Sequence, residues 1–368
     1  MYRLSYFLPL LALLFSYFIG INQDYWWAYL LLAATALGLI EFMRYRFVNF
    51  NATEYLSGYV TCVEHLNAWV EKVVTKETKY DSSGKSYTVE KVEYREHPDE
   101  WYWYLNTGHC QYISDSLFSQ MCQIWRTGLY QFETYHQNCV SGGGGERCYW
   151  NQIEYDTYTI TYPHKYRNPM LQSQSLFKSS LMAANIDIRK IGLFDYPAIG
   201  GFDQQVILCH PELSVPEYFE QANVALQHLN AFMGLQHQIH VFILLFKAEQ
   251  GLEIAAMQRD YWKGLNKNEF VVCLGVEERQ VKWCEALSWM DLPTLSLKTR
   301  DYFIEHDTLD LLAFVAWLRG NLDSWKRKEF KDFAYLPKKM SLQKAAIYWS
   351  VSVLLGILVL VFCLVIGH

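Results

Sequence analysis

The sequence lacks the motifs that mark a nucleotide site or an activated nucleophile. No GxSxG elbow, no GxxxxGK[ST] phosphate loop and no GxGxxG turn opening a helix occurs in its 368 residues. The glycine run Gly142–Gly145 is not followed by the Lys and Ser or Thr of a phosphate loop. These absences exclude P-loop, Rossmann and α/β-hydrolase sites. Nucleophilic catalysis by a Cys–His pair stays open, because nine Cys and 11 His offer many pairs and none stands out.

A concentrated positive charge is missing as well. The net charge is −6, and no basic stripe is interleaved with aromatic residues, so nucleic acid is not an expected partner. CxxC spacing is also absent. For the His and Cys residues that could otherwise bind zinc, we therefore expect buried thiols or a single disulfide instead of a zinc site. That group consists of His109, Cys110, Cys122, Cys139 and Cys148.

Long apolar stretches are present, but only near the two ends of the chain. They cover Leu4–Ile21, Trp26–Met43 and Ala345–Ile366. Each is about as long as a helix that crosses a ~30 Å hydrocarbon core, which takes roughly 17–25 residues. A cleaved signal peptide fits less well, because a second stretch follows instead of a small-x-small cleavage site. We therefore expect a multi-pass membrane protein with three spans, with a transmembrane helix hairpin in residues 1–43 and a transmembrane helix in residues 337–368.

Basic residues beside these stretches predict the orientation of the protein. Arg44 and Arg46 follow the second stretch, and seven Lys or Arg between Lys326 and Lys344 precede the third. The positive-inside rule then places the body between the spans in the cytoplasm. A reducing compartment would keep Cys139 and Cys148, which flank the glycine run, as thiols.

The first part of the body, residues 44–195, is predicted to be a β-rich domain with many aromatic residues. Glu71–Tyr80 and Lys85–Tyr94 are strand-like and are separated by a four-residue turn that ends in glycine. Charges on both faces predict that this hairpin projects into water or onto a partner. We also expect a helix over Ser114–Trp125 and a strand over Tyr155–Tyr162 that Pro163 ends.

The second part, residues 196–336, alternates strands and helices, which predicts a three-layer α/β domain. A capping box at Ser214–Glu217 starts one helix, and Gly234 is its expected end. The other predicted elements follow in chain order. They are strands at Gln205–Cys209, His240–Phe246, Phe270–Val276 and Gln280–Trp289, and helices at Leu252–Gly264 and Asp307–Trp325. The fold class is therefore an α+β membrane protein.

This second part resembles the TPM domain family over about a third of the chain. The resemblance rests on a helix at Phe219–Gly234 before the apolar strand Ile239–Leu245, and on an Ala-rich helix, Glu253–Gly264, with an aromatic before its glycine. Asn266–Glu269 stands where the family has Asp-Asn-Gly, and Val281–Glu285 with Asp291 stands where it has Gly-x-Gly. The resemblance implies tethering to a membrane and a role in assembling, repairing or modulating membrane complexes. Some family members act as phosphatases or bind divalent cations.

Oxygen ligands form the best candidate metal site. Asn266, Asn268, Glu269, Glu285 and Asp291 are expected near strand ends, where α/β sheets bind ligands and where Ca²⁺ or Mg²⁺ would find oxygen donors. Ordinary charges on a solvated loop are the alternative. No catalytic residue and no organic cofactor is predicted.

The sequence favours a membrane-tethered accessory or assembly protein without catalytic activity. Its expected partners are the lipid bilayer and other proteins of a membrane complex. Two alternatives remain open. One is a TPM-type divalent-cation-dependent hydrolase or phosphatase at the membrane. The other is a structural subunit of a membrane oligomer, in which the partner is a second copy of the chain.

Overall fold

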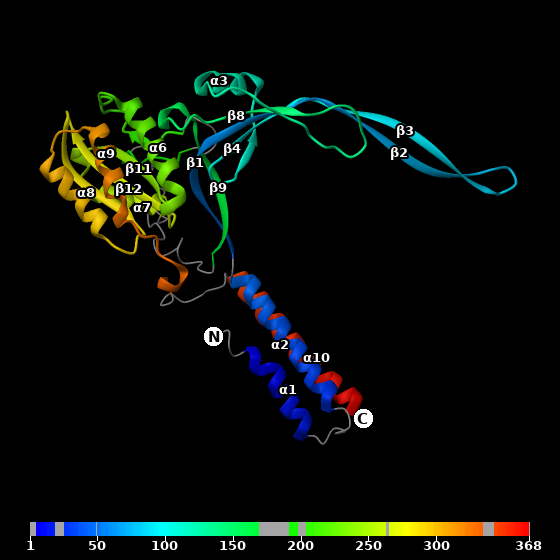
Figure 1. Cartoon of the computed structure of the whole chain (residues 1–368). Helices are drawn as coiled ribbons and strands as arrows, with labels where there is room; N and C mark the ends of the chain where they lie inside the picture. The colour runs from blue at the N-terminus through cyan, green and yellow to red at the C-terminus, as the bar shows by residue number, and fades with distance from the viewer. Residues whose placement is uncertain are drawn as a thin grey trace.

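The computed structural model is a mixed α+β structure with three parts: a bundle of apolar helices, a β-rich module and an α/β module (Figure 1). The two modules sit together at one end of the bundle. The structure describes residues 5–18, 26–48, 50–168, 191–197, 204–262, 265–333 and 342–367.

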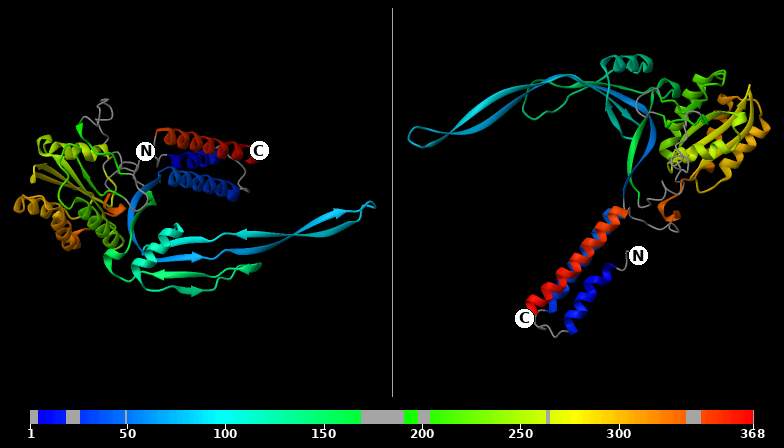
Figure 2. Two further views of the ribbon diagram at one scale, coloured as in Figure 1. Left: turned by 90° about the horizontal axis from the view of Figure 1, so that it is seen from above. Right: turned by 180° about the vertical axis from the view of Figure 1, so that it is seen from behind.

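The apolar bundle consists of α1 (Phe7–Phe18), α2 (Trp26–Val48) and α10 (Leu342–Gly367), which lie side by side (Figure 2). Two helices, Trp26–Val48 and Leu342–Phe362, are long and apolar enough to cross a membrane. The described part of α1 has 12 residues, fewer than the roughly 20 that a spanning helix needs. The remainder of the first predicted span lies outside the described residues.

Small side chains, together with the larger Tyr29 and Tyr348, form the buried contacts inside the bundle. Ala12 of α1, Ala36 of α2 and Val359 of α10 pack together and are buried. Small residues allow helix backbones to approach closely where no hydrophobic effect drives the association. Glu41, an acidic residue of α2, pairs with Arg44 one turn later.

The β-rich module is built around β1 (Phe50–Leu66), which begins two residues after α2 ends. Its first half pairs with β9 (Thr159–Asn168), and its second half pairs with β4 and β8, always antiparallel. The other strands of the sheet are β4 (Glu100–Leu105), β5 (Cys110–Tyr112), β6 (Tyr130–Phe132) and β8 (Gly145–Tyr149).

The prediction that Pro163 ends a strand was wrong. Residues Glu154–Asp156 form a 3₁₀ turn, and β9 starts at Thr159 and continues through Pro163, which lies opposite Tyr55. In the described part of the chain β9 pairs only with β1. A proline that lacks a donor is tolerated on such a free edge.

The predicted helix at 114–125 is confirmed as α3 (Asp115–Trp125). The side chain of Ser114 caps it by accepting a hydrogen bond from the backbone N–H of Leu117 at 3.3 Å. Met121 and Trp125 on its inner face pack against β1 and β4 and are buried. This helix gives the β-rich module a hydrophobic core of its own.

The predicted hairpin is also confirmed, as β2 (Trp69–Tyr80) and β3 (Ser86–His97). We call this ribbon the arm. It extends far from both modules, and β7 (Cys139–Gly142) pairs only with its base (Figures 1 and 2). At the tip, Asp81 accepts hydrogen bonds from the backbone N–H groups of Ser83 and Lys85, both at 2.9 Å. Gly84 takes the left-handed conformation, with φ +81°, that this turn requires.

The α/β module contains one sheet in the order β10-β11-β12-β13. The first three strands are parallel, and the last forms a hairpin with β12, as the sequence predicts. The predicted core residues Val241, Ile243, Leu245, Val271, Val272 and Leu274 are all fully buried. The strands are β10 (Ile207–Cys209), β11 (His240–Lys247), β12 (Glu269–Glu277) and β13 (Gln280–Ser288).

Helices cover both faces of this sheet. The segment 191–197 and the end of α7 place the rings of Phe194, Tyr196 and Trp262 on Phe242 and Phe246. Helices α8 and α9 cover the opposite face. The helices are α6 (Phe219–His237), α7 (Glu253–Tyr261), α8 (Thr294–Glu305) and α9 (Leu311–Asn321).

Three predicted helix boundaries were wrong. Helix α6 starts at Phe219 after a left-handed Tyr218 without any side-chain cap, so no capping box forms at Ser214. It runs past Gly234, where a Cβ would lie only 3.3 Å from the carbonyl oxygen of Ser57, so this glycine permits close packing on β1. The helix predicted from Asp307 starts at Leu311, because Asp310 caps it by accepting from Ala313 N at 2.9 Å.

The two modules pack against each other along β1 and α6. The rings of Tyr59 in β1 and Phe232 in α6 stack with centroids 4.1 Å apart. Near one end of this contact, Arg319 donates to both carboxylate oxygens of Glu154, at 2.5 and 2.9 Å. Near the other end, Arg327 pairs with Glu54. The modules therefore share one continuous interface.

Candidate functional site

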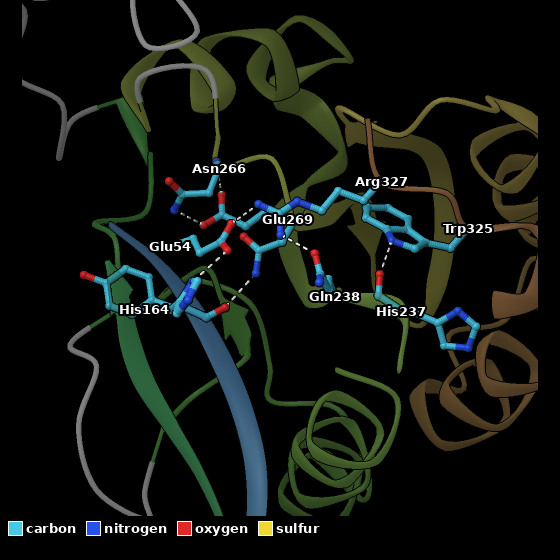
Figure 3. Close-up of polar contacts among 10 residues, drawn as sticks. Glu54, His164, His237, Gln238, Asn266, Glu269, Trp325 and Arg327 are labelled. Atoms are coloured by element: carbon cyan, nitrogen blue, oxygen red, sulfur yellow. Dashed lines mark hydrogen bonds and ion pairs between the residues drawn. The ribbon is translucent and has the colours of Figure 1, made fainter. Parts of the chain in front are cut away.

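Three of the predicted site residues meet where the two modules join. Asn266, Asn268 and Glu269 lie at the amino end of β12, beside β1 (Figure 3). Open α/β sheets bind their ligands at the opposite edge, outside the carboxyl ends of the parallel strands. The prediction that these residues lie at a strand end is therefore correct. They lie, however, at the amino end of β12 and not at the carboxyl end, where ligands bind.

Glu269 is buried and holds a closed set of hydrogen bonds. Asn266 donates to it twice, from its backbone N–H at 2.8 Å and from its side-chain amide at 2.6 Å. The hydroxyl of Tyr196 donates to the same carboxylate at 2.6 Å. Burial raises the pKa of Glu269, and these hydrogen bonds oppose the shift. The buried carboxylate fixes the loop before β12 against the segment 191–197.

Asn268 connects the two modules. Its side-chain amide donates to the carbonyl oxygen of Tyr55 in β1 at 2.6 Å, and its own backbone carbonyl accepts from His240 N at 2.7 Å. The His240 ring is fully buried, and its Nδ1 lies 3.2 Å from the hydroxyl of Ser57. Burial lowers the pKa of His240 to about 3, so the ring is neutral at pH 7.

A second carboxylate, Glu54 of β1, lies beside this group (Figure 3). It pairs with Arg327 and lies 3.1 Å from the Nδ1 of His164. Arg327 also donates to the side-chain oxygen of Gln238 at 2.7 Å, which fixes its guanidinium at the end of α6. Only 2% of the Glu54 side chain and 16% of the Arg327 side chain are exposed, so the pair is shielded from water.

Lys267 and Tyr166 complete the electrostatic surroundings. Burial and the nearby Arg327 lower the pKa of Lys267 to about 8, while Glu54 opposes the shift. Burial raises the pKa of Tyr166 to about 12. We call Glu54, Arg327, Lys267, Asn268 and Glu269 the junction network. Perturbed pKa values gather at functional sites and also in structural ion-pair networks.

The other two predicted site residues are elsewhere. Glu285 lies within β13 and pairs with Arg300 of α8. Asp291 follows β13 and faces Lys326 at 3.3 Å. Within the residues that the structure describes, no group of three or more His, Cys, Asp or Glu side chains is placed to hold a metal ion. The five predicted ligands of Ca²⁺ or Mg²⁺ thus do not come together. Three of them lie in one buried group, and the other two form separate ion pairs.

A cavity does occupy the edge where α/β sheets bind ligands. It has a volume of about 300 Å³ and lies against Cys209, Leu245 and Val276, near the carboxyl ends of β10, β11 and β12. At its rim, Glu217 and Arg279 form a largely exposed ion pair at 3.8 Å. The lining combines aliphatic side chains with hydroxyl groups and with four charged residues, which are Glu217, Glu278, Arg279 and Asp310.

The thiols of the β-rich module are free. Cys139 is exposed in β7 and Cys148 is buried in β8, and neither is in a disulfide. Of the residues considered for zinc, His109 stacks on Tyr162 with ring centroids 4.6 Å apart. Burial raises the pKa of Cys62 to about 12, which makes this buried thiol a poor nucleophile at neutral pH.

Three members of the junction network were not predicted from the sequence, namely Glu54, Arg327 and Lys267, the last of which lies between the predicted ligands Asn266 and Asn268. Glu54 is an isolated acidic residue in a strand, and no local pattern marks it. Arg327 belongs to the basic cluster that the sequence analysis used only for membrane orientation. Their pairing joins positions that are 273 residues apart, so it depends on the packing of whole modules.

In comparisons with known proteins, no family model, no curated protein and no solved structure matches the chain. The resemblance to the TPM domain therefore stays a prediction.

Proposed function

We propose that the chain is a membrane-tethered accessory protein whose cytoplasmic body binds another protein of a membrane complex without catalysing a reaction. Helices at both ends of the chain would hold the body beside the bilayer. The arm carries this proposal, because none of its side chains belongs to a hydrophobic cluster of the described chain, whereas the bundle and both modules each have such a cluster.

The arm adds little to the stability of the body. Nearly all side chains along its outer two thirds are exposed on both faces. Its ion pairs, such as Lys76–Glu90 at 3.4 Å and Lys91–Glu93 at 2.5 Å, are exposed, and exposed pairs add little to stability. A two-stranded ribbon is marginally stable alone in water. Because the arm gains so little stability from its own contacts, we infer that its role is to contact another molecule.

One face of the arm is better suited to that contact. The strand register places Val74 directly opposite Val92, and Tyr80 and Tyr94 point to the same side of the ribbon. All four are exposed, the tyrosines by 71% and 65%. Tyrosine combines a large apolar ring with a hydroxyl and is enriched at protein interfaces. We call this side the Tyr94 face.

The two faces of β3 permit a matched test. The double variant Val92→Ser/Tyr94→Ser removes a valine and a tyrosine from the Tyr94 face. The control, Tyr87→Ser/Val89→Ser, removes the same two residue types from the opposite face. Full-length tagged protein is purified from native membranes, and co-purifying proteins are quantified by mass spectrometry.

We expect the Tyr94-face variant to lose a specific partner that the control variant retains. Deletion of residues 77–88 should lose the same partner while leaving the thermal unfolding of the body unchanged. Equal retention in both double variants would refute the arm as the recognition element. Recovery of only a second copy of the chain would identify a structural oligomer instead.

The orientation is tested separately. The basic flanks at Arg44 and Lys326–Lys344 motivate a cytoplasmic body. A reporter that fluoresces only in the cytoplasm, fused after Tyr335 in a chain truncated there, should be bright. A dark fusion together with an active reporter of the opposite compartment would overturn this orientation.

A further inference from the structure

A second cavity lies between the modules, at the end of their interface farthest from the apolar bundle. Its volume is about 480 Å³, within the range of roughly 300–1,000 Å³ that ligand sites occupy. One wall comes from the start of β9 and the turn before it, and the other comes from α6. The register of β9 fixes this position, because Thr159 pairs with Tyr59 while Asn168 pairs with Phe50 beside the bundle.

The chemistry of the lining is polar and nearly uncharged. Of its ten residues, four carry hydroxyl groups, three carry side-chain amides, one is His228 and one is aliphatic. Glu220 is the single formally charged residue, and neither Lys nor Arg takes part. The guanidinium of Arg319, which acts on His228, is bound to Glu154. Hydroxyls and amides can both donate and accept hydrogen bonds.

Two polar side chains in this wall are buried, and one of them has an atom without a hydrogen-bond partner. His228 is 4% exposed, and its Nδ1 has no hydrogen-bond partner. Asn223 is 6% exposed, and its Oδ1 accepts from the backbone N–H groups of Val206 and Ile207 at 2.9 and 3.1 Å. These two bonds fix the amide plane of Asn223, which also lines the cavity. Buried polar groups normally have partners, so such groups call for one.

We propose that this cavity binds a neutral, polyhydroxylated ligand, namely a monosaccharide or the terminal sugar of a glycan. A sugar offers hydroxyls that both donate and accept, which matches amides, hydroxyls and a neutral imidazole. Burial lowers the pKa of His228, which keeps its ring uncharged at neutral pH.

The same lining disfavours other ligand classes. An anion such as a nucleotide would meet the carboxylate of Glu220 and no cation of the cavity wall. An apolar ligand would bury hydroxyl and amide groups without hydrogen-bond partners, which opposes binding. A metal ion would find a single carboxylate in the wall.

Tyr155 supplies the remaining element of sugar recognition. Its ring is 62% exposed at the edge of the cavity and contacts the ring of His228 with centroids 4.7 Å apart. The C–H groups of a pyranose form an apolar face that packs on such a ring. A ligand held there would touch Tyr155 of the β-rich module and α6 of the α/β module, and would bind both modules together.

The test measures binding of sugars to the full chain by saturation-transfer NMR. The protein is kept in an amine-oxide detergent, because maltoside and glucoside detergents carry the group being tested. The probes are glucose, galactose, mannose and N-acetylglucosamine, each as the free sugar and as its methyl glycoside, at about 10 mM to detect weak sites. Glucose 6-phosphate is the charged counterpart of glucose.

We expect at least one neutral sugar to bind and glucose 6-phosphate to bind more weakly than glucose. Binding of a methyl glycoside would identify a glycan terminus as the source, and binding of the free sugar alone would identify a monosaccharide. The variants Tyr155→Ser and His228→Phe should each weaken binding roughly tenfold. The control Tyr135→Ser, at a residue that is 96% exposed outside the cavity, should bind like the unmodified chain.

Three results would overturn the proposal. They are no signal from any neutral sugar, a signal that survives in Tyr155→Ser, and equal binding of glucose and glucose 6-phosphate. If His228→Phe fails to fold, Tyr155→Ser decides alone, because its exposed side chain leaves the core unchanged.

Discussion

Arg327 of the α/β module and Glu54 of the β-rich module form an ion pair that is almost completely shielded from water. Glu54 stands four residues after the start of β1, and Arg327 lies in the basic segment that precedes α10. The pair thus joins the two stretches of chain that lead into the apolar bundle. At the other end of the interface, Arg319 of the α/β module pairs in the same way with Glu154 of the β-rich module. Each end of the interface is therefore held by an ion pair between an arginine of the α/β module and a glutamate of the β-rich module.

We predict that Arg327→Met lowers the free energy of unfolding by about 3–5 kcal/mol. Breaking a buried ion pair by removing one partner leaves a buried charge without compensation, here that of Glu54. The measurement is denaturant unfolding of the full chain, followed by tryptophan fluorescence. The control is Arg279→Met, since Arg279 is 80% exposed and its pair with Glu217 contributes at most about 1 kcal/mol.

The double variant Glu54→Gln/Arg327→Met separates loss of charge compensation from loss of packing. It should regain a large part of the stability that Arg327→Met loses, because a neutral pair carries no uncompensated charge. If both variants are equally unstable, the methylene groups of Arg327 matter more than its charge.

We predict that Leu274→Ala costs roughly 2–5 kcal/mol, the usual range for a buried leucine. Leu274 is fully buried in the central strand β12. Leu235→Ala serves as the matched control, because Leu235 is 53% exposed on α6 and its change should cost less than about 0.5 kcal/mol. Similar costs for the two variants would contradict the assignment of β12 to the core.

Local patterns predicted most of the secondary structure. The buried strands β11 and β12 show as continuous apolar runs, and the arm shows as two strand-like runs around a turn with Gly84. Errors arose where tertiary contacts outweigh local signals. Gly234 resembles a helix end, yet it is needed for close packing on β1, and Pro163 resembles a strand end, yet it lies on a free edge.

The candidate site was predictable only in part. Asn266, Asn268 and Glu269 adjoin one another in sequence, so their common location at a strand end followed from the apolar run after them. Glu285 and Asp291 were expected to join them, but the antiparallel direction of β13 places Glu285 opposite Cys273, well along β12. Glu54 comes from a different module, and no pattern in one strand predicts a partner in another module.

The predicted cation site gives a direct test. The carboxylate oxygens of Glu269 are already bound by Asn266 and Tyr196, and Glu285 and Asp291 pair with basic residues. We therefore expect about 1 mM Ca²⁺ or Mg²⁺ to leave the unfolding temperature unchanged, although a bound cation would raise it. A rise that Glu269→Gln abolishes, while the exposed Glu305→Gln retains it, would instead establish the cation site.

His240 makes the stability of the protein depend on pH in a predictable direction. Burial lowers its pKa in the folded chain to about 3, while in the unfolded chain the ring has its ordinary value of 6.5. Below pH 6.5 the unfolded chain binds a proton that the folded chain does not, so stability is present above 6.5 and is lost as the pH falls toward 3. The loss approaches about 1.4 kcal/mol per pH unit for one such proton. His228 shifts in the same direction.

The variant His240→Gln should therefore have a shallower pH dependence of its unfolding free energy between about pH 7 and about pH 5. Glutamine does not titrate in this range, and its amide can still bond to the hydroxyl of Ser57, which lies 3.2 Å from His240 Nδ1. The control His306→Gln removes an exposed histidine and should retain the original slope. The readout is the slope and not the absolute stability, so a packing defect at His240 does not imitate the effect. An unchanged slope in His240→Gln would show that the ring takes up its proton in the folded chain, and that water reaches its buried position.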